Sequence, residues 1–192
     1  MNTVYDTMTK LDLFYLGVEK AQRFLDAQGF DYPKYIARNL RAGLTGFYNL
    51  KNKIYVDVEA CAKPASNPSP RRCSFPGWKT DRTPVGVVCH ETGHYISQIL
   101  SSNRIHYNSK WEISLKRSKK VSGYEPNLEE AFAESMRLFI LNPNLLKSAS
   151  PERFVYLHKI CKMKLSHRKT VRQVLIHHPK YIKYANTWVA KI

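Results

Sequence analysis

Two histidines four residues apart, with a glutamate directly after the first, constrain this chain most: His90-Glu91-Thr92-Gly93-His94. On a helix, residues i and i+4 project from one face, about 6 Å apart along the axis. Both imidazoles can therefore bind one zinc ion, whereas Glu91 points too far round the helix to be a ligand. Zinc lowers the pKa of a bound water to about 7, and Glu91 would remove its proton as the water attacks a carbonyl. The pattern predicts a zinc metallopeptidase, and two ordinary surface histidines are the alternative.

The residues around this pattern favour a buried helix. Apolar side chains recur at roughly helical spacing on both sides of the histidines: Val87, Val88, Tyr95, Ile99 and Leu100. Buried histidine and glutamate side chains need partners, because an unpaired buried charge is costly. A metal ion supplies such a partner, so this context supports a metal site over surface histidines.

A second helix, predicted from Asn127 to Phe139, offers the third ligand that catalytic zinc requires beside its open position. Asn127 is a good N-cap, and acidic residues fill the first turn. Glu130 and Glu134 lie on one face, so the simplest assignment makes Glu130 the ligand and Glu134 a carboxylate that orients a ligand histidine. Glu129 is expected in solvent. The alternative is that all three acids are helix-N-terminal charges without a metal role.

These patterns resemble the catalytic core of the anthrax lethal factor-like metallopeptidases, which include the Pro-Pro endopeptidases. The resemblance rests on the string from His90 to His94, on Tyr124 and on Glu130-Ala131-Phe132-Ala133-Glu134, and it spans roughly residues 53–157. It implies a gluzincin with a zincin-like fold and one Zn²⁺ per chain, held by His90, His94 and Glu130. It also implies that Tyr124 donates a hydrogen bond to the developing oxyanion. Phage and bacterial proteins share this layout.

Tyr124 also has a physical case of its own. Ser122 and Gly123 before it and Pro126 after it predict a loop, where rigid neighbours can position a functional side chain. A phenol near the metal can donate to the tetrahedral intermediate, which is typically worth about 3 kcal/mol. The alternative is that Tyr124 is one of many core or surface aromatics among the chain's twelve tyrosines.

The chain is predicted to form a single α+β domain over residues 1–192, mostly helical, with a small sheet beside the helix of the histidine pair. Its segments are N-terminal helices (1–45), strands (46–60), a Pro-rich basic loop (61–83), the catalytic core (84–145) and basic C-terminal helices (146–192). Within the first segment, we expect a helix over 11–25 closed by Gly29 and a shorter one from Pro33 to about Arg41.

Two strands, 46–50 and 53–59, are predicted on either side of a Lys51-Asn52 turn. Residues 54–58 are the candidate sheet edge for pairing with an extended substrate. The Pro-rich stretch 62–83 then leads directly into the histidine helix. Loops of this length are often functional or disordered, so it is either a rim over the cleft or an unstructured surface segment.

The chain is strongly basic, with 31 Lys and Arg against 15 Asp and Glu and a net charge of +16. The excess concentrates in residues 116–120 and 147–192, and in the latter Glu152 is the sole acid. Apolar residues at helical spacing over 181–192 predict a core-facing stripe there. Surfaces as basic as those of residues 116–120 and 147–192 attract nucleic acid or acidic proteins. These are expected partners in addition to the protein or peptide substrate of the enzyme. A nucleic-acid-binding protein that keeps the zincin fold without proteolysis is therefore the alternative function, although the intact Glu91 favours the enzyme.

The chain lacks an apolar stretch of about 18 residues, and residues 1–6 lack the basic region of a secretory signal. A cytoplasmic or intracellular location is expected, for either a bacterial protein or a phage-encoded one that acts in the host cell. The four cysteines, Cys61, Cys73, Cys89 and Cys161, show no paired metal-ligand spacing and are expected to be reduced. A disulfide between Cys61 and Cys73 would form only in an exported protein.

Overall fold

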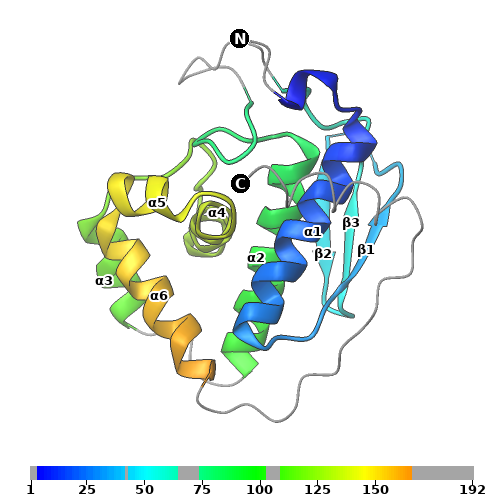
Figure 1. The fold of residues 1–192 in the computed structure, drawn as a ribbon. Coiled ribbons are helices and arrows are strands. Elements are labelled where there is room, and N and C mark those ends of the chain that lie inside the picture. Colours follow the sequence, from blue (N-terminus) through cyan, green and yellow to red (C-terminus); the bar gives the residue numbers. More distant parts are fainter. Residues whose placement is uncertain (1–3, 42, 65–73, 103–108, 166–192) are drawn as a thin grey trace.

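The computed structural model describes residues 4–41, 43–64, 74–102 and 109–165 (Figure 1). After a short 3-10 helix, Val4–Thr7, these ranges contain the following elements in chain order: α1 (Lys10–Gln28), β1 (Lys34–Ala37), β2 (Gly46–Asn49), β3 (Lys53–Val56), α2 (Pro84–Ser102), α3 (Ser109–Arg117), α4 (Leu128–Leu141), α5 (Pro143–Ala149) and α6 (Pro151–Leu165). The protein is thus mostly helical with one small sheet, as predicted. Within these ranges, no helix combines the length and the apolar character needed to cross a membrane.

Helix α2 is the central element of the fold. It packs against α1, against α4 and against strands β2 and β3, while α3, α5 and α6 form a group on the far side of α4 (Figure 1). The two histidines of the sequence pattern therefore lie on a helix that is surrounded by the rest of the described chain.

The sheet has the strand order β1-β3-β2, with β1 parallel and β2 antiparallel to β3. Two predictions are wrong here. The helix expected from Pro33 to Arg41 is instead strand β1, because residues 34–37 pair with β3 and the Tyr35 hydroxyl lies 3.2 Å from Thr92 Oγ1. Since β1 occupies one side of β3 and β2 the other, residues 54–58 do not form the sheet edge. The strand edge beside α2 belongs to β2.

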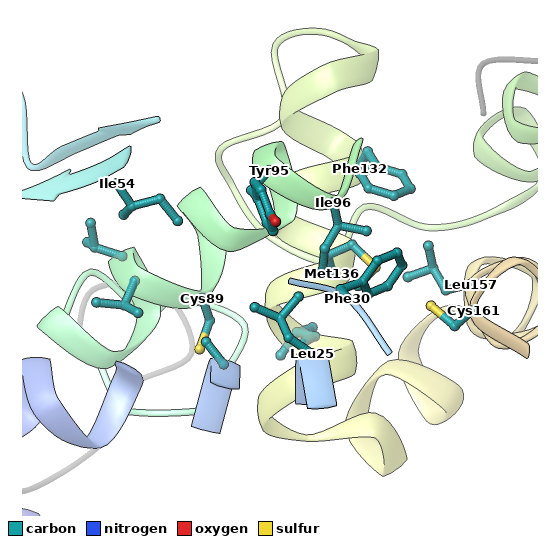
Figure 2. Packing of buried hydrophobic residues seen from close by; sticks show 14 of the residues in the cluster. Leu25, Phe30, Ile54, Cys89, Tyr95, Ile96, Phe132, Met136, Leu157 and Cys161 are labelled. Carbon is teal, nitrogen blue, oxygen red and sulfur yellow. The ribbon is translucent and has the colours of Figure 1, made fainter. Parts of the chain in front are cut away.

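One hydrophobic cluster joins the sheet to the helices, as Figure 2 shows. Five elements each contribute a side chain that is 0% exposed: Leu25 from α1, Ile54 from β3, Ile96 from α2, Met136 from α4 and Leu157 from α6. Full burial of a side chain of this size contributes about 1.5–3 kcal/mol. The apolar face of α2 is therefore fixed in the core, and this sets the direction in which its polar face points.

The ends of the helices follow the capping residues in the sequence. The Asn127 side chain accepts a hydrogen bond from the Glu130 N–H at 2.9 Å, and Thr83 caps α2 through the Gly86 N–H at 3.4 Å. Helix α1 ends at Gly29, which has a left-handed conformation (φ 65°). The predictions of α1, α2 and α4 are thus confirmed, and α4 extends two residues beyond its predicted end at Phe139.

Gly93 lies at a close approach between α2 and α4. A Cβ added at this position would lie 2.8 Å from Ala133 Cα and 3.0 Å from Ala133 O. Gly93→Ala must therefore push the two helices apart, and we expect it to lower the free energy of unfolding by about 1–3 kcal/mol. Urea titration measures this change.

Gly123→Ala is the matched control, because a Cβ at Gly123 would meet no atom within 4 Å. Its stability should stay within about 0.5 kcal/mol of the parent. Equal stabilities of the two variants would show that the helices can separate at no cost.

Candidate metal centre

Three side chains from α2 and α4 bring their donor atoms to one point. His90 Nε2 lies 3.2 Å from His94 Nε2 and 3.0 Å from Glu130 Oε2, and His94 Nε2 lies 3.5 Å from the same oxygen. Nitrogen and oxygen ligands at about 2.0–2.2 Å from a tetrahedral zinc ion would be about 3.3–3.6 Å apart. The spacing of the three atoms is therefore close to that of three corners of a metal-centred tetrahedron, and His90, His94 and Glu130 could hold a metal ion.

The environment of Glu130 also fits a cation. Its Oε2 atom is buried and accepts no hydrogen bond within the described structure, although both histidine nitrogens are near. The interactions with His90 and then His94 lower the pKa of Glu130 to about 2, so the carboxylate is charged. The oxygen faces His90 Nε2 at 3.0 Å and His94 Nε2 at 3.5 Å, and a cation between the three atoms would be a partner for all of them. Two imidazoles and one carboxylate are the donor set found at open zinc sites.

Glu134 is hydrogen-bonded to the first histidine of the pattern. Its Oε1 atom accepts a hydrogen bond from His90 Nδ1 at 2.7 Å, and the other ring nitrogen, Nε2, faces the candidate metal position. Burial opposes protonation of His90, but Glu130 and Glu134 together raise its pKa to about 9. Both carboxylates thus favour positive charge at this point of the fold.

Arg137 holds Glu134 in place. This arginine was not among the site residues predicted from the sequence. Its guanidinium, which is 0% exposed, donates to both oxygens of Glu134, at 3.0 Å from Nε and 2.9 Å from Nη2. It also donates to the carbonyls of Trp78 (2.7 Å) and Lys79 (3.1 Å), and lies 4.0 Å from the Asp81 carboxylate. The i,i+3 spacing from Glu134 is a signal that could have revealed the pair. Arg137 therefore joins α4 to the segment before α2.

We expect Arg137→Met to destabilise the protein by about 3–5 kcal/mol, because it leaves the buried carboxylates of Glu134 and Asp81 without their cation. Burial already raises the pKa of Asp81 to about 6, despite the opposing charge of Arg137. The free energy of unfolding in urea is the measurement. Arg23→Met, which removes an exposed ion pair with Glu19, is the control and should cost less than about 1 kcal/mol. Similar losses in both variants would contradict the role assigned to Arg137.

Glu91 lies beside the three donor atoms without belonging to them. It is 7% exposed, and it accepts a hydrogen bond from the main-chain N–H of Tyr48 in β2. A Cβ at Gly46 would lie 3.0 Å from Glu91 Oε1, so β2 runs directly past this carboxylate. Burial raises the pKa of Glu91, against the opposing effect of the two histidines. Such a shift moves a carboxylate toward the range in which it exchanges protons near neutral pH.

Tyr124, in the loop between α3 and α4, lies beside the three donor atoms of the candidate metal site. Its ring centroid is 5.9 Å from that of His90, and 52% of the residue is exposed. The loop is held at Glu125, which accepts the N–H of Val121 (2.7 Å) and pairs with buried Arg153 at 2.9 Å. Burial and then the nearby carboxylates raise the pKa of Tyr124, so the phenol keeps its proton and can donate it in a hydrogen bond.

All six predicted site residues line one cleft of about 1090 Å³. Its walls also include residues of β2 and of the segment from Ser74 to Arg82, so this end of the predicted Pro-rich loop forms a rim. Residues 65–73 of that loop lie outside the described residues, as does the basic stretch 166–192 with its predicted apolar stripe.

Cys61, Cys89 and Cys161 are buried and free, and burial raises the pKa of each thiol. Cys73, the other half of the disulfide considered above, lies outside the described residues.

Comparisons of the chain with known protein families, with curated proteins and with solved structures found no match.

Proposed function

We propose that this protein is a zinc-dependent endopeptidase with a zincin-like fold. The observation that carries the proposal is the place of Glu91, a buried carboxylate next to the three donor atoms of His90, His94 and Glu130 that is not one of them. A purely structural metal site has no use for such a group, whereas hydrolysis requires a base beside the metal. The open cleft and the half-exposed Tyr124 support the same conclusion.

Each residue of the cleft would then have a distinct role. Zinc, when bound, would act as a Lewis acid that acidifies water and polarises the scissile carbonyl. Glu91 would accept a proton from the attacking water and pass it to the leaving amine. Tyr124 would donate a hydrogen bond to the carbonyl oxygen as negative charge develops on it. Glu134, itself held by Arg137, would keep the His90 ring in its binding orientation.

The β2 edge would bind the main chain of the substrate. The Asp57 N–H donates to Thr45 O, so alternate residues from Thr45 onward pair with β3, and Gly46 and Tyr48 direct their main-chain groups outward. The Tyr48 N–H is taken by Glu91. The remaining groups at this edge are available to an extended peptide.

Incubation of the zinc-loaded protein with an unfolded protein substrate and a peptide mixture tests the proposal, with products identified by mass spectrometry. We expect internal cleavage that stops on addition of a chelator and returns with zinc. Failure of a protein that contains one zinc ion per chain to cleave any of these substrates would contradict it.

Binding of a polyanion is a second candidate function, favoured by four exposed basic residues near the end of α3: Lys116, Arg117, Lys119 and Lys120. Phosphate contacts from such a group release counterions, so affinity for DNA should fall steeply as salt rises. Nucleic-acid binding of the Glu91→Gln variant, measured between 50 and 200 mM salt, separates this role from proteolysis.

A further inference from the structure

Two cations, Lys79 and Arg82, line one end of the cleft without an acidic partner among the described residues. Both side chains are exposed. Residues 65–73, 103–108 and 166–192 contain no Asp or Glu side chain. The buried acids nearest to the pair in sequence and in the cleft are already engaged: Asp81 accepts from Thr83 Oγ1 at 2.6 Å, and Glu134 is bound by Arg137.

The main chain under these two residues is fixed on several sides. The Arg82 N–H donates to Ser74 Oγ at 3.2 Å, and the Arg82 carbonyl accepts from the Ala62 N–H at 2.9 Å. The Lys79 carbonyl accepts from buried Arg137. Two unpaired cationic side chains on a rigid base form a preorganised site, because binding a ligand there costs little ordering of the main chain.

Both cations line the same cleft as the candidate metal ligands and Tyr124. Burial and the nearby acids raise the pKa of the Tyr124 phenol, and the positive charge of Arg82 opposes this shift. Lys79 and Arg82 precede the first turn of α2, whereas Ser97 and Gln98, which also line the cleft, lie in the last two turns of this helix. The two cations therefore lie before the start of α2, in a cleft whose lining also includes Asp81, Glu91, Glu129, Glu130 and Glu134.

We infer that Lys79 and Arg82 form a carboxylate-binding subsite, which makes peptides with a carboxylate on that side of the scissile bond the preferred substrates. The inference rests on the proposed peptidase function for its substrate class. The guanidinium of Arg82 can bind both oxygens of a carboxylate, and the Lys79 ammonium adds a second positive charge. The carboxylate comes either from an internal Asp or Glu side chain or from the C-terminus of the peptide.

Peptide binding to the zinc-loaded Glu91→Gln variant, measured by fluorescence anisotropy, tests the subsite without requiring turnover. The probes share one sequence and carry Glu with an amidated C-terminus, Gln with a free C-terminus, or Gln with an amidated C-terminus. We expect one of the first two to bind on the order of tenfold more tightly than the neutral third. Tighter binding of the first assigns the subsite to an internal acid, and tighter binding of the second assigns it to the C-terminus.

The preference should disappear when Lys79→Ala and Arg82→Ala are both added to the Glu91→Gln variant. It should persist when Lys116→Ala and Lys120→Ala are added in their place, because these two lysines lie outside the cleft. Zinc content of each variant verifies that the site is intact. Equal binding of all three probes, no binding of any probe, or an unchanged preference in the Lys79/Arg82 variant would overturn the inference. Cleavage by the parent without this preference would refute the subsite but not the peptidase. Acid-dependent binding without cleavage by the parent would refute the peptidase but not the subsite.

Discussion

Zinc is expected to be lost from the Glu130→Ala variant, because this substitution removes one of three donor atoms that already lie 3.0–3.5 Å apart. The fall in affinity should exceed the 10–100-fold change that is typical when a residue behind a ligand is replaced, since Glu130 supplies a donor itself. Metal content after dialysis, measured by plasma mass spectrometry, gives the result directly. The parent should contain about one zinc ion per chain.

Glu129→Ala is the matched control for this experiment. Glu129 precedes Glu130 in the first turn of α4 and is exposed, so the substitution changes the charge of the helix start by the same amount. It should retain the zinc of the parent. If Glu130→Ala binds zinc as tightly as Glu129→Ala, the assignment of the third ligand is wrong.

Turnover should fall by about 10²–10⁴-fold in Glu91→Gln, the typical contribution of a general acid–base group, while the zinc content stays at the parental value. Glutamine fills the same space between α2 and β2 and can still bond to Tyr48, but it cannot accept a proton from water. The measurement is kcat on a cleaved peptide, together with metal content of the same preparation.

Two results would contradict this role for Glu91. Loss of zinc from Glu91→Gln would make Glu91 a ligand or a structural support, and undiminished kcat would assign the base to another group. Glu112→Gln, at an exposed glutamate on α3 outside the cleft, controls for the change of charge and should keep both zinc and turnover.

The parts of the fold that sequence could predict depend on local signals. Helices α1 and α4 carry their own ends in Gly29 and Asn127, and α2 combines an apolar face with the spacing of His90 and His94. The pairing of Glu130 with both histidines was accessible for the same reason. Fixed helical spacing places Glu130 and Glu134 on one face of α4, and a metal site needs a third donor.

What sequence could not supply depends on contacts between distant segments. Residues 34–37 become a strand because β3 offers them a parallel partner, and that pairing in turn moves the sheet edge from β3 to β2. Tertiary pairing of this kind routinely overrides local preference. Arg137 donates to the main-chain carbonyls of Trp78 and Lys79, almost sixty positions earlier in the chain. No local pattern in the sequence predicts this contact.

The Arg137 contacts have a mechanical consequence for the cleft. They tie the rim around Trp78 and Lys79 to α4, so this wall and the helix that carries Glu130 should move as one body. Amide hydrogens of the rim, such as that of Gly77 on the Asp81 carboxylate, should then exchange with deuterated solvent almost as slowly as those of α4. The facing hairpin ends in a turn at Leu50, which is 77% exposed, and should exchange faster. The cleft would therefore adjust to bulkier peptides by motion of one wall, while the wall that bears the metal ligand stays still.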